Sequence, residues 1–310
     1  MSWSTDDIPD LTGRTAVVTG FTGGLGAAAA TELARKGASL VVTARDASKA
    51  DEYLAALRRE VPDAEVEVVS LDLADLEGSK AAAAAVAGAH PTIDILVNNA
   101  GIMIPPKRQT ADGYELQIGT NHLGHFAWTA TLWPVLAASN ARVVSVSSVA
   151  HTSATGIDLR SLTPEGSPRR YRRWQSYGES KLANLVFALE LDRRVKAAGL
   201  GVVSVAAHPG YALTNLQSSG LKMGSTPLPG IALHQVSRIV GQPAAHGAWP
   251  LEMAATDPSL TGGEYIGPSN LGGMRGRPKR VGMTRTARDE ALADNLWAAS
   301  ESAADVTFGV

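Results

Sequence analysis

Short apolar runs alternate with longer helical stretches along this chain. Six runs rich in Val, Ile and Leu have the continuous apolar pattern of strands covered on both faces, at residues 15–19, 39–43, 66–70, 93–97, 142–146 and 202–206. Helical patterns follow at 24–36, 47–60, 75–89, 112–138, 176–198 and 286–304. This spacing favours right-handed crossovers and therefore predicts an α/β fold, a doubly wound parallel sheet flanked by helices.

Two segments break this rhythm. Residues 152–175 contain Pro, Gly and several Arg, and we interpret them as an insertion. Residues 267–280 are expected to form a glycine-rich basic loop, which opens a C-terminal extension over 267–310. No linker or internal repeat divides the chain, so residues 1–310 are expected to form a single domain.

A glycine cluster connects the first predicted strand to the first predicted helix. Such a turn lets the backbone approach a pyrophosphate, and the helix N-terminus supplies free N–H groups and partial positive charge. The sequence Thr19-Gly-Phe-Thr-Gly-Gly-Leu-Gly fits both TGxxxGxG and TGxxGxxG, so it does not choose between branches of dinucleotide-binding folds. The residues expected to contact the cofactor here are Gly20, Thr22, Gly23, Gly24, Leu25 and Gly26.

The end of the second predicted strand bears on the choice between NADP(H) and NAD(H). Arg45 occupies the place where NAD-binding proteins carry an acid for the ribose 2′-hydroxyl, and a guanidinium suits a 2′-phosphate. NADP(H) is therefore favoured, although the adjacent Asp46 keeps NAD(H) possible. Asp72 and Leu73 follow the third strand, where the Asp72 carboxylate could lie near the adenine or could stabilise a helix N-terminus.

Tyr177 and Lys181 are four residues apart at the start of a predicted helix, so both side chains can enter one pocket. Proton transfer near neutrality needs the tyrosine pKa, ordinarily about 10, lowered by roughly three units, or about 4 kcal/mol. An ammonium at ~5 Å supplies about 3 kcal/mol at an effective dielectric of 20. A positively charged oxidised nicotinamide could supply the remainder.

Three further groups are expected at the carboxyl edge of the sheet, where open parallel sheets bind ligands. Ser147 and Ser148 close the fifth strand, and a hydroxyl there could stabilise charge on a substrate oxygen. Residues 98–101, Asn-Asn-Ala-Gly, end the fourth strand, unless they form an ordinary turn. Asn121 interrupts a helical stretch, where it is either a buried amide that opens the helix locally or an exposed helical residue.

Composition narrows the remaining chemistry. The chain has no cysteine, which excludes disulfides, thiolate metal sites and cysteine nucleophiles. Its net charge of −2 gives no reason to expect a nucleic-acid partner. His122 and His125 have helical spacing but no third ligand, so no metal is predicted. The basic residues of 169–174 are expected to be a solvated part of the insertion. The sequence shows neither a signal peptide nor a membrane span, so a cytoplasmic location is expected.

Taken together, these motifs resemble those of the short-chain dehydrogenase/reductase family. The matching segments are TGFTGGLG, LDL, NNAG, NHLGHF, VVSVSS, YGESK and HPGYALT, in family order from residue 13 to about 216. NHLGHF, Arg45, His151 after SSVA and the late ARDEALADNLWAASE helix look most like the retinol-dehydrogenase-like group. The separation of 29 residues between Ser148 and Tyr177 exceeds that of compact members, and the 152–175 insertion accounts for it.

The resemblance implies a Rossmann fold and roles for particular residues. It implies a catalytic tetrad of Asn121, Ser148, Tyr177 and Lys181, with Ser148 rather than Ser147 as the catalytic hydroxyl. The cofactor would also contact Asn99, Ala100, Gly101, Tyr177, Lys181, Pro209, Gly210 and Thr214, with His208 beside the carboxamide site. Residues 212–240 would form a lid whose apolar content suggests a bulky hydrophobic substrate.

The predicted activity is hydride transfer between NADP(H) and a small-molecule carbonyl or alcohol. Two alternatives stay open at this point: a nucleotide-sugar epimerase or dehydratase, which shares TGxxGxxG and YxxxK, and a non-catalytic protein that senses the cofactor. A homodimer or homotetramer is expected by family analogy.

Overall fold

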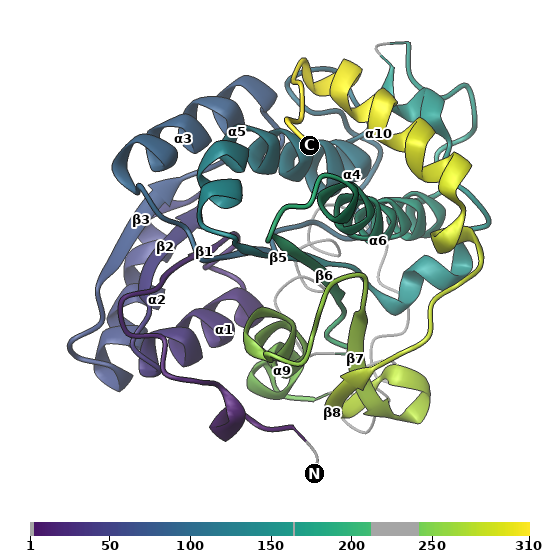
Figure 1. Cartoon of the computed structure of the whole chain (residues 1–310). Coiled ribbons are helices and arrows are strands. Elements are labelled where there is room, and N and C mark those ends of the chain that lie inside the picture. The colour runs from purple at the N-terminus through teal and green to yellow at the C-terminus, as the bar shows by residue number, and fades with distance from the viewer. Residues whose placement is uncertain (1–2, 164, 212–241) are drawn as a thin grey trace.

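The computed structural model describes residues 3–163, 165–211 and 242–310 and contains one eight-stranded sheet in the order β3-β2-β1-β4-β5-β6-β7-β8 (Figure 1). All neighbouring strands are parallel except β7 and β8. The strands are β1 (Thr15–Val18), β2 (Ser39–Ala44), β3 (Val66–Ser70), β4 (Ile95–Asn98), β5 (Arg142–Val146), β6 (Val203–Ala207), β7 (Tyr265–Asn270) and β8 (Arg275–Arg280).

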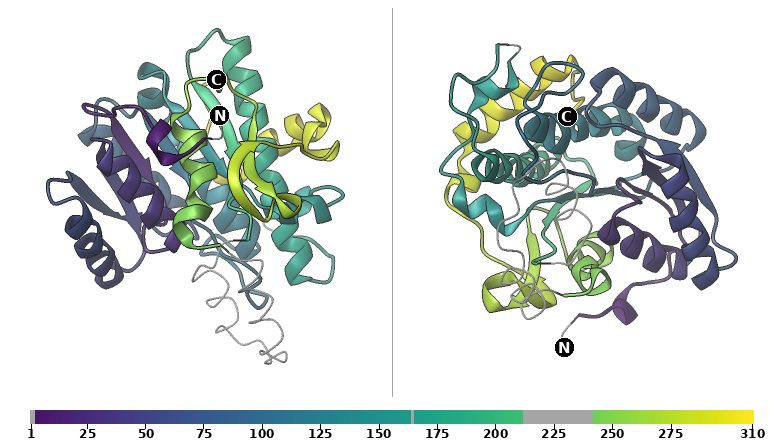
Figure 2. Two further views of the ribbon diagram at one scale, coloured as in Figure 1. Left: turned by 90° about the horizontal axis from the view of Figure 1, so that it is seen from below. Right: turned by 180° about the vertical axis from the view of Figure 1, so that it is seen from behind.

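Helices cover both faces of this sheet (Figures 1 and 2). They are α1 (Gly24–Arg35), α2 (Ala47–Glu60), α3 (Leu76–Ala89), α4 (Leu116–Ile118), α5 (Gly124–Ala138), α6 (Arg173–Ala197), α9 (Ala244–Thr256) and α10 (Glu290–Ala304). Two separate hydrophobic cores result, one beneath α3, α5, α6 and α10 and the other beneath α1, α2 and α9. The predicted α/β fold with a doubly wound sheet is therefore confirmed.

The chain ends lie on opposite layers of the molecule (Figures 1 and 2). Trp3, Ile8 and Leu11 join the core under α1 and α9. Phe308 joins the other core, where its ring lies 4.8 Å from Trp297 and 5.4 Å from Phe126, measured between ring centroids. The residues after α10 thus hold that helix against α5 and α6.

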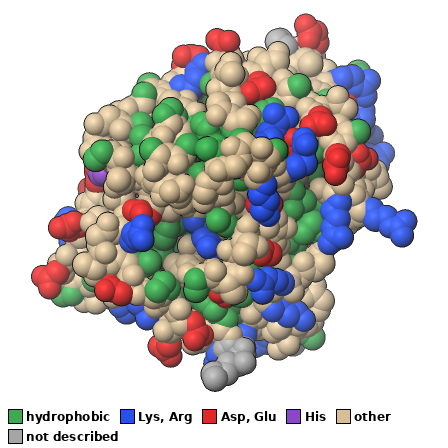
Figure 3. All heavy atoms as spheres, in the orientation of Figure 1, with side chains coloured by type: hydrophobic (Ala, Val, Ile, Leu, Met, Phe, Trp, Pro, Cys, Tyr) green, Lys and Arg blue, Asp and Glu red, His purple; other side chains and the backbone are tan. Residues whose placement is uncertain are grey.

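The predicted loop over residues 267–280 is wrong, because these residues complete β7 and form the antiparallel edge strand β8. The sequence of β8 is RGRPKR, and among its residues only Pro278 is buried. An exposed, charged edge strand has no apolar run that could identify it. Positive side chains are also more frequent on the half of the surface that carries α6, α10 and this hairpin (Figure 3).

Two helices also differ from their predicted bounds. The helix expected at 112–138 begins at Leu116 and contains a π-helical turn, η2 (Gly119–Leu123), before α5. Helix α6 begins at Arg173, three residues earlier than expected. Helix α9 was not predicted.

Candidate active site

The glycine turn between β1 and α1 is fixed by close backbone contacts. A Cβ on Gly20, whose φ is +78°, would lie 2.8 Å from Ala100 Cα, and one on Gly26 would lie 2.4 Å from the Gly20 oxygen. The N-cap residue Gly23 offers no side chain to the first N–H groups of α1, and the first turn contains no acidic residue. These N–H groups are therefore available to an anion, and the turn fits a dinucleotide pyrophosphate.

Thr19 connects this turn to the end of β4. Its hydroxyl oxygen accepts hydrogen bonds from the backbone N–H groups of Asn99, at 2.9 Å, and Ala100, at 3.0 Å. The same hydroxyl lies 2.9 Å from Nε2 of His125, and Asn99 Nδ2 donates to the Thr19 carbonyl at 2.8 Å. The predicted cofactor residues Asn99 and Ala100 thus lie beside the glycine turn.

Arg45 and Asp46 lie at the carboxyl end of β2, but their side chains do different things. Asp46 caps α2, accepting from Lys49 N at 3.3 Å, and hydrogen bonds from Ser48 and Lys49 lower its pKa. Arg45 is exposed. The carboxylate that kept NAD(H) possible is therefore committed to a helix N-terminus, whereas the guanidinium is accessible at this strand end.

Asp72 and Leu73 follow β3. The Asp72 side chain is exposed and accepts from Ala74 N at 3.0 Å, while Asp75 caps α3. The alternative that Asp72 stabilises a helix N-terminus is therefore wrong. Leu73 is buried in the core, where a Cβ on Gly124 would lie 2.3 Å from its oxygen.

Asn121 lies in the π-helical turn, a distortion frequent at functional sites. Its amide is fully buried; Oδ1 accepts from Ile102 N at 2.8 Å, and Nδ2 donates to Ile102 O at 3.0 Å and to Ser180 Oγ at 2.9 Å. The interpretation as an exposed helical residue is wrong, and the expected local opening of the helix is confirmed. Gly101 lies directly beside it, since a Cβ there would lie 2.9 Å from Asn121 Oδ1 and 3.6 Å from Lys181 Nζ.

The two serines after β5 have different partners. The buried Ser147 hydroxyl donates to the Lys181 carbonyl at 2.7 Å, which ties β5 to α6. Ser148 is half-buried; its hydroxyl accepts from Ala150 N at 3.1 Å, and its interaction with the Tyr177 phenol opposes the rise in the pKa of Tyr177. Ser148 is thus the serine that faces Tyr177.

Tyr177 and Lys181 are both buried and lie close together, as their spacing predicts. Lys181 Nζ lies 6.0 Å from the Tyr177 ring centroid and donates to Val146 O at 3.0 Å. Burial raises the pKa of Tyr177 to about 12 and lowers that of Lys181 to about 8. The protein by itself thus does not bring the pKa of Tyr177 toward neutrality, because burial disfavours the phenolate. That the ammonium and a positively charged nicotinamide together lower this pKa stays a prediction.

The segment after β6 is supported by elements that the sequence did not reveal. Gly210 has a φ of +66°, and a Cβ there would lie 2.4 Å from the Met274 oxygen. Tyr211 N donates to the same oxygen at 2.8 Å. The buried Gln242 donates to Pro209 O at 3.0 Å and accepts from Gly276 N at 3.2 Å. The β7–β8 hairpin therefore fixes residues 209–211; Thr214 and the predicted lid at 212–240 lie outside the described residues.

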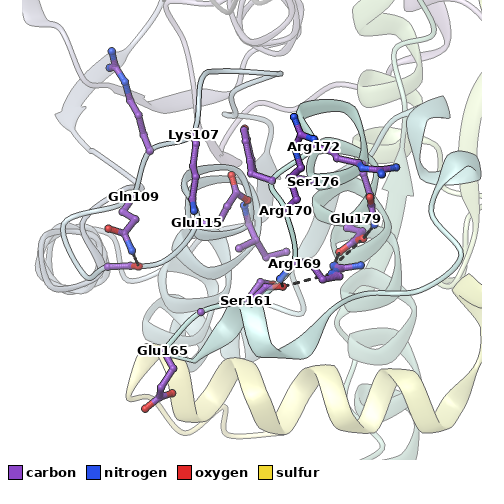
Figure 4. A pocket seen from close by; sticks show the side chains of 17 residues that line it. Lys107, Gln109, Glu115, Ser161, Glu165, Arg169, Arg170, Arg172, Ser176 and Glu179 are labelled. Atoms are coloured by element: carbon purple, nitrogen blue, oxygen red, sulfur yellow. Dashed lines mark hydrogen bonds and ion pairs between the residues drawn. The ribbon is translucent and has the colours of Figure 1, made fainter.

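A hollow of about 150 Å³ lies beside the first turn of α6, between the insertion and the segment that precedes α4 (Figure 4). Arg169 crosses it, with its guanidinium 2.7 Å from Asp158 and 2.8 Å from Glu179. Arg169, Arg170 and Arg172 are all exposed, as expected, but the ion pairs of Arg169 also join the insertion to α6 two residues after Tyr177.

His122 and His125 are buried and hydrogen-bonded rather than arranged around a metal. His122 Nε2 lies 2.8 Å from Ser300 Oγ, and His125 Nδ1 lies 3.0 Å from the Asn121 oxygen. Across residues 3–163, 165–211 and 242–310, no group of three metal-binding side chains is found. In the same ranges no helix has the length and apolar character needed to cross a membrane.

Comparison with known proteins places this geometry in a family. Residues 14–157 match the family model for short chain dehydrogenase. The chain is 36% identical to human retinol dehydrogenase 13 over 297 residues, 94% of this chain and 84% of that protein. It is 35% identical to mouse polyprenol dehydrogenase over 302 residues, with shares of 94% and 84%.

Solved structures agree with this assignment. The fold resembles an uncharacterised protein from Mycobacterium paratuberculosis, with a TM-score of 0.80, 39% identity and full coverage of both chains. It also resembles a Burkholderia cenocepacia short chain dehydrogenase in complex with NADP, with a TM-score of 0.62 and 25% identity over 83% of this chain and 96% of that one. The chain therefore belongs to the short-chain dehydrogenase/reductase family, in its retinol-dehydrogenase-like group, and is an NAD(P)-dependent oxidoreductase acting on alcohol and carbonyl groups.

Proposed function

We propose that the protein transfers a hydride between NADP(H) and a bulky apolar carbonyl or alcohol, with Asn121, Ser148, Tyr177 and Lys181 as its catalytic residues. The observation that carries the proposal is that three of these groups lie together: the Ser148 side chain interacts with the Tyr177 phenol, and Lys181 Nζ lies 6.0 Å from the Tyr177 ring centroid. The named dehydrogenase relatives favour this reaction over epimerisation and over cofactor sensing.

The four side chains have different roles in the proposed reaction. In reduction, the hydroxyls of Ser148 and Tyr177 donate hydrogen bonds to the substrate oxygen, and Tyr177 transfers its proton as charge develops there. Lys181 stabilises the resulting phenolate by its positive charge. Asn121 holds the backbone of Ile102 and so positions Gly101 beside Lys181. The nicotinamide, when bound, supplies the hydride in reduction and accepts it in oxidation.

Two features support NADP(H) as the cofactor. Arg45 is accessible at the end of β2, and the Asp46 carboxylate is committed to capping α2. Among the cofactor contacts we propose, Gly20, Thr22, Gly23, Gly24, Leu25 and Gly26 hold the pyrophosphate, and Asp72 and Leu73 lie at the adenine. Asn99, Ala100, Gly101, Pro209 and Gly210 would line the rest of the cofactor site.

The proposed substrate class follows from the apolar surroundings of Tyr177. Trp174 is 62% exposed, and its ring centroid lies 6.5 Å from that of Tyr177. A large aromatic side chain beside a reacting hydroxyl offers a surface for an apolar substrate. By their names, the two relatives above act on retinol and polyprenol, which are long apolar alcohols.

The reaction is tested by replacing the phenol. Y177F should lower turnover with retinal or a prenyl aldehyde by about 10² to 10⁴, the usual contribution of a general acid. Its affinity for NADPH, measured by tryptophan fluorescence, should change little. Y114F is the matched control, because the Tyr114 hydroxyl donates to Ala303 O in a different part of the protein. Full activity in Y177F contradicts the proposal.

The cofactor is tested separately. R45D should weaken NADPH binding far more than NADH binding, because a carboxylate repels the 2′-phosphate. R59D, at an exposed position in the last turn of α2, makes the same charge change and should alter neither affinity selectively. Equal losses for both cofactors in R45D would reject Arg45 as the specificity residue.

A further inference from the structure

His151 lies three residues after Ser148, in the single turn η3 (Val149–Ser153). Two nitrogen atoms of His151 converge on the Ser148 carbonyl: the backbone N at 3.0 Å and the ring Nδ1 at 2.7 Å. A carbonyl can only accept, so Nδ1 must carry the ring proton. That assigns the neutral tautomer with a lone pair on Nε2.

The other ring nitrogen has no such partner. His151 is 3% exposed, and its Nε2 has no hydrogen-bond partner among the residues that the structure describes. A buried acceptor without a donor is unfavourable. The opposite tautomer would be less favourable, because the lone pair on Nδ1 would then face, and repel, the lone pairs of the Ser148 carbonyl oxygen. The ring orientation is therefore the one that keeps the bond to Ser148.

Tyr265 holds the His151 ring in this orientation. The two rings pack edge to face, with centroids 5.3 Å apart and an interplanar angle of 83°. The Tyr265 hydroxyl lies 3.4 Å from His151 Nδ1, and its interaction with the Ser147 side chain opposes the rise that burial causes in the pKa of Tyr265. Ser147 in turn donates to the Lys181 carbonyl. The rings and hydroxyls thus connect both serines to the helix that carries Tyr177 and Lys181.

We propose that His151 is a positioning residue that acts through Ser148. By donating from Nδ1 to the Ser148 carbonyl, His151 fixes the backbone at the end of β5, and so keeps the Ser148 hydroxyl against the Tyr177 phenol. This inference rests on the proposed function of Ser148, but the bond itself does not depend on that function.

Two polar variants separate the ring nitrogens. In H151N the amide places an N–H where Nδ1 stands, whereas in H151Q the amide reaches the position of Nε2. H151N should keep kcat within about threefold of wild type, and H151Q should lose at least about tenfold, since one misplaced oxyanion donor costs 10²–10³. The affinity for NADPH should not change in either variant. Equal kcat values in the two variants would overturn the proposal.

A double-mutant cycle tests whether the effect passes through Ser148. In an S148A background, adding H151Q should lower kcat by less than about twofold, because the hydroxyl that His151 positions is already absent. If the losses multiply instead, His151 acts by another route and the proposal is wrong. H246N is the matched control, because His246 is exposed on α9 and should leave kcat unchanged.

A measurement that does not use activity separates this inference from the proposed function. Nitrogen NMR of histidine-labelled protein, with H151N to assign the signal among the seven histidines, reports which ring nitrogen is protonated. A proton on Nδ1 of His151 supports the inference, and a proton on Nε2 overturns it, whether or not any carbonyl substrate is reduced. Absence of turnover on every carbonyl tested would reject only the proposed function.

Discussion

Acid should destabilise this protein well before its surface carboxylates are protonated, because four histidines of the described residues are buried in the neutral form. His122, His125 and His208 carry the large pKa shifts and are 2%, 3% and 4% exposed; His151 is 3% exposed, and burial also lowers its pKa, which adds to the same effect. Burial is the main cause that lowers the pKa values of His122, His125 and His208, to about 3, about 4 and about 3. The unfolded chain binds protons at the ordinary histidine pKa of about 6.5.

The sign of the effect follows from this difference. Between pH 6.5 and pH 4 the unfolded state binds more protons at these sites, so stability is complete above pH 6.5 and is lost as the pH falls. Each histidine contributes a loss of about 2 kcal/mol at pH 5. Glu252 opposes them: it is 1% exposed, and burial raises its pKa well above the ordinary value, so the folded state takes up its proton first.

The net expectation is uptake of about two protons on unfolding near pH 5.5, a slope of about 3 kcal/mol per pH unit. The loss at pH 5 is then about 4 kcal/mol, a large part of the 5–15 kcal/mol typical of a domain. Urea unfolding followed by tryptophan fluorescence from pH 8 to pH 5 measures the slope.

Variants identify the groups responsible. E252Q mimics the protonated acid and removes the opposing contribution, so the slope should steepen to about 4 kcal/mol per pH unit. H122N should flatten the slope by about one proton, and H246Q, at an exposed position, should not change it. A free energy of unfolding that stays constant from pH 6.5 to pH 5 would refute the reasoning.

Three other predictions concern packing and the cofactor turn. F308A should cost about 3–5 kcal/mol of stability by urea unfolding, because its buried ring packs against four other aromatic side chains; an unchanged midpoint would contradict this packing. G26A should abolish NADPH binding in a titration, whereas G88A, at an exposed helix position with open space, should bind normally and gain up to about 1 kcal/mol. R169L should lower the free energy of unfolding by about 2 kcal/mol, because it leaves the Glu179 carboxylate, which is 9% exposed, without this ion-pair partner. This figure is discounted for the 43% exposure of the Arg169 guanidinium, and R169K should recover part of the loss.

Much of the fold could be predicted because most of its strands and helices have recognisable local patterns of apolar and polar residues. The parallel strands β1, β2, β4, β5 and β6 are apolar runs whose residues are largely buried, whereas β3 at the sheet edge is largely exposed and was identified from its valines alone. Helix α9 was missed for the opposite reason: its buried residues occur on every side, and Gly247 and Pro250 interrupt it, so it lacks an amphipathic period. The edge strand β8 is charged and exposed, and a charged, glycine-containing segment of this kind is typical of a loop.

In the candidate site, too, some features could be predicted from local spacing and others depend on tertiary contacts. Motif spacing brings Tyr177 and Lys181 together, because four residues make about one helical turn. Which of Ser147 and Ser148 faces the phenol depends on the register of β5 against α6, and that is a tertiary property. The contribution of Gln242 to the backbone at Pro209 could not be inferred, because an isolated glutamine carries no signal of its partner.

The electrostatics of Tyr177 also bear on how the proposed site works. With a pKa of about 12 for Tyr177 and about 8 for Lys181, the protein by itself holds both groups protonated at neutral pH. A neutral phenol beside an ammonium is the state that donates a proton to a carbonyl oxygen. In the proposed reaction, oxidation would require the phenolate, which burial disfavours and which hydrogen bonds or nearby positive charge stabilise. The folded chain by itself would therefore hold the Tyr177 phenol in the form that donates a proton, and proton abstraction would need further stabilisation of the phenolate.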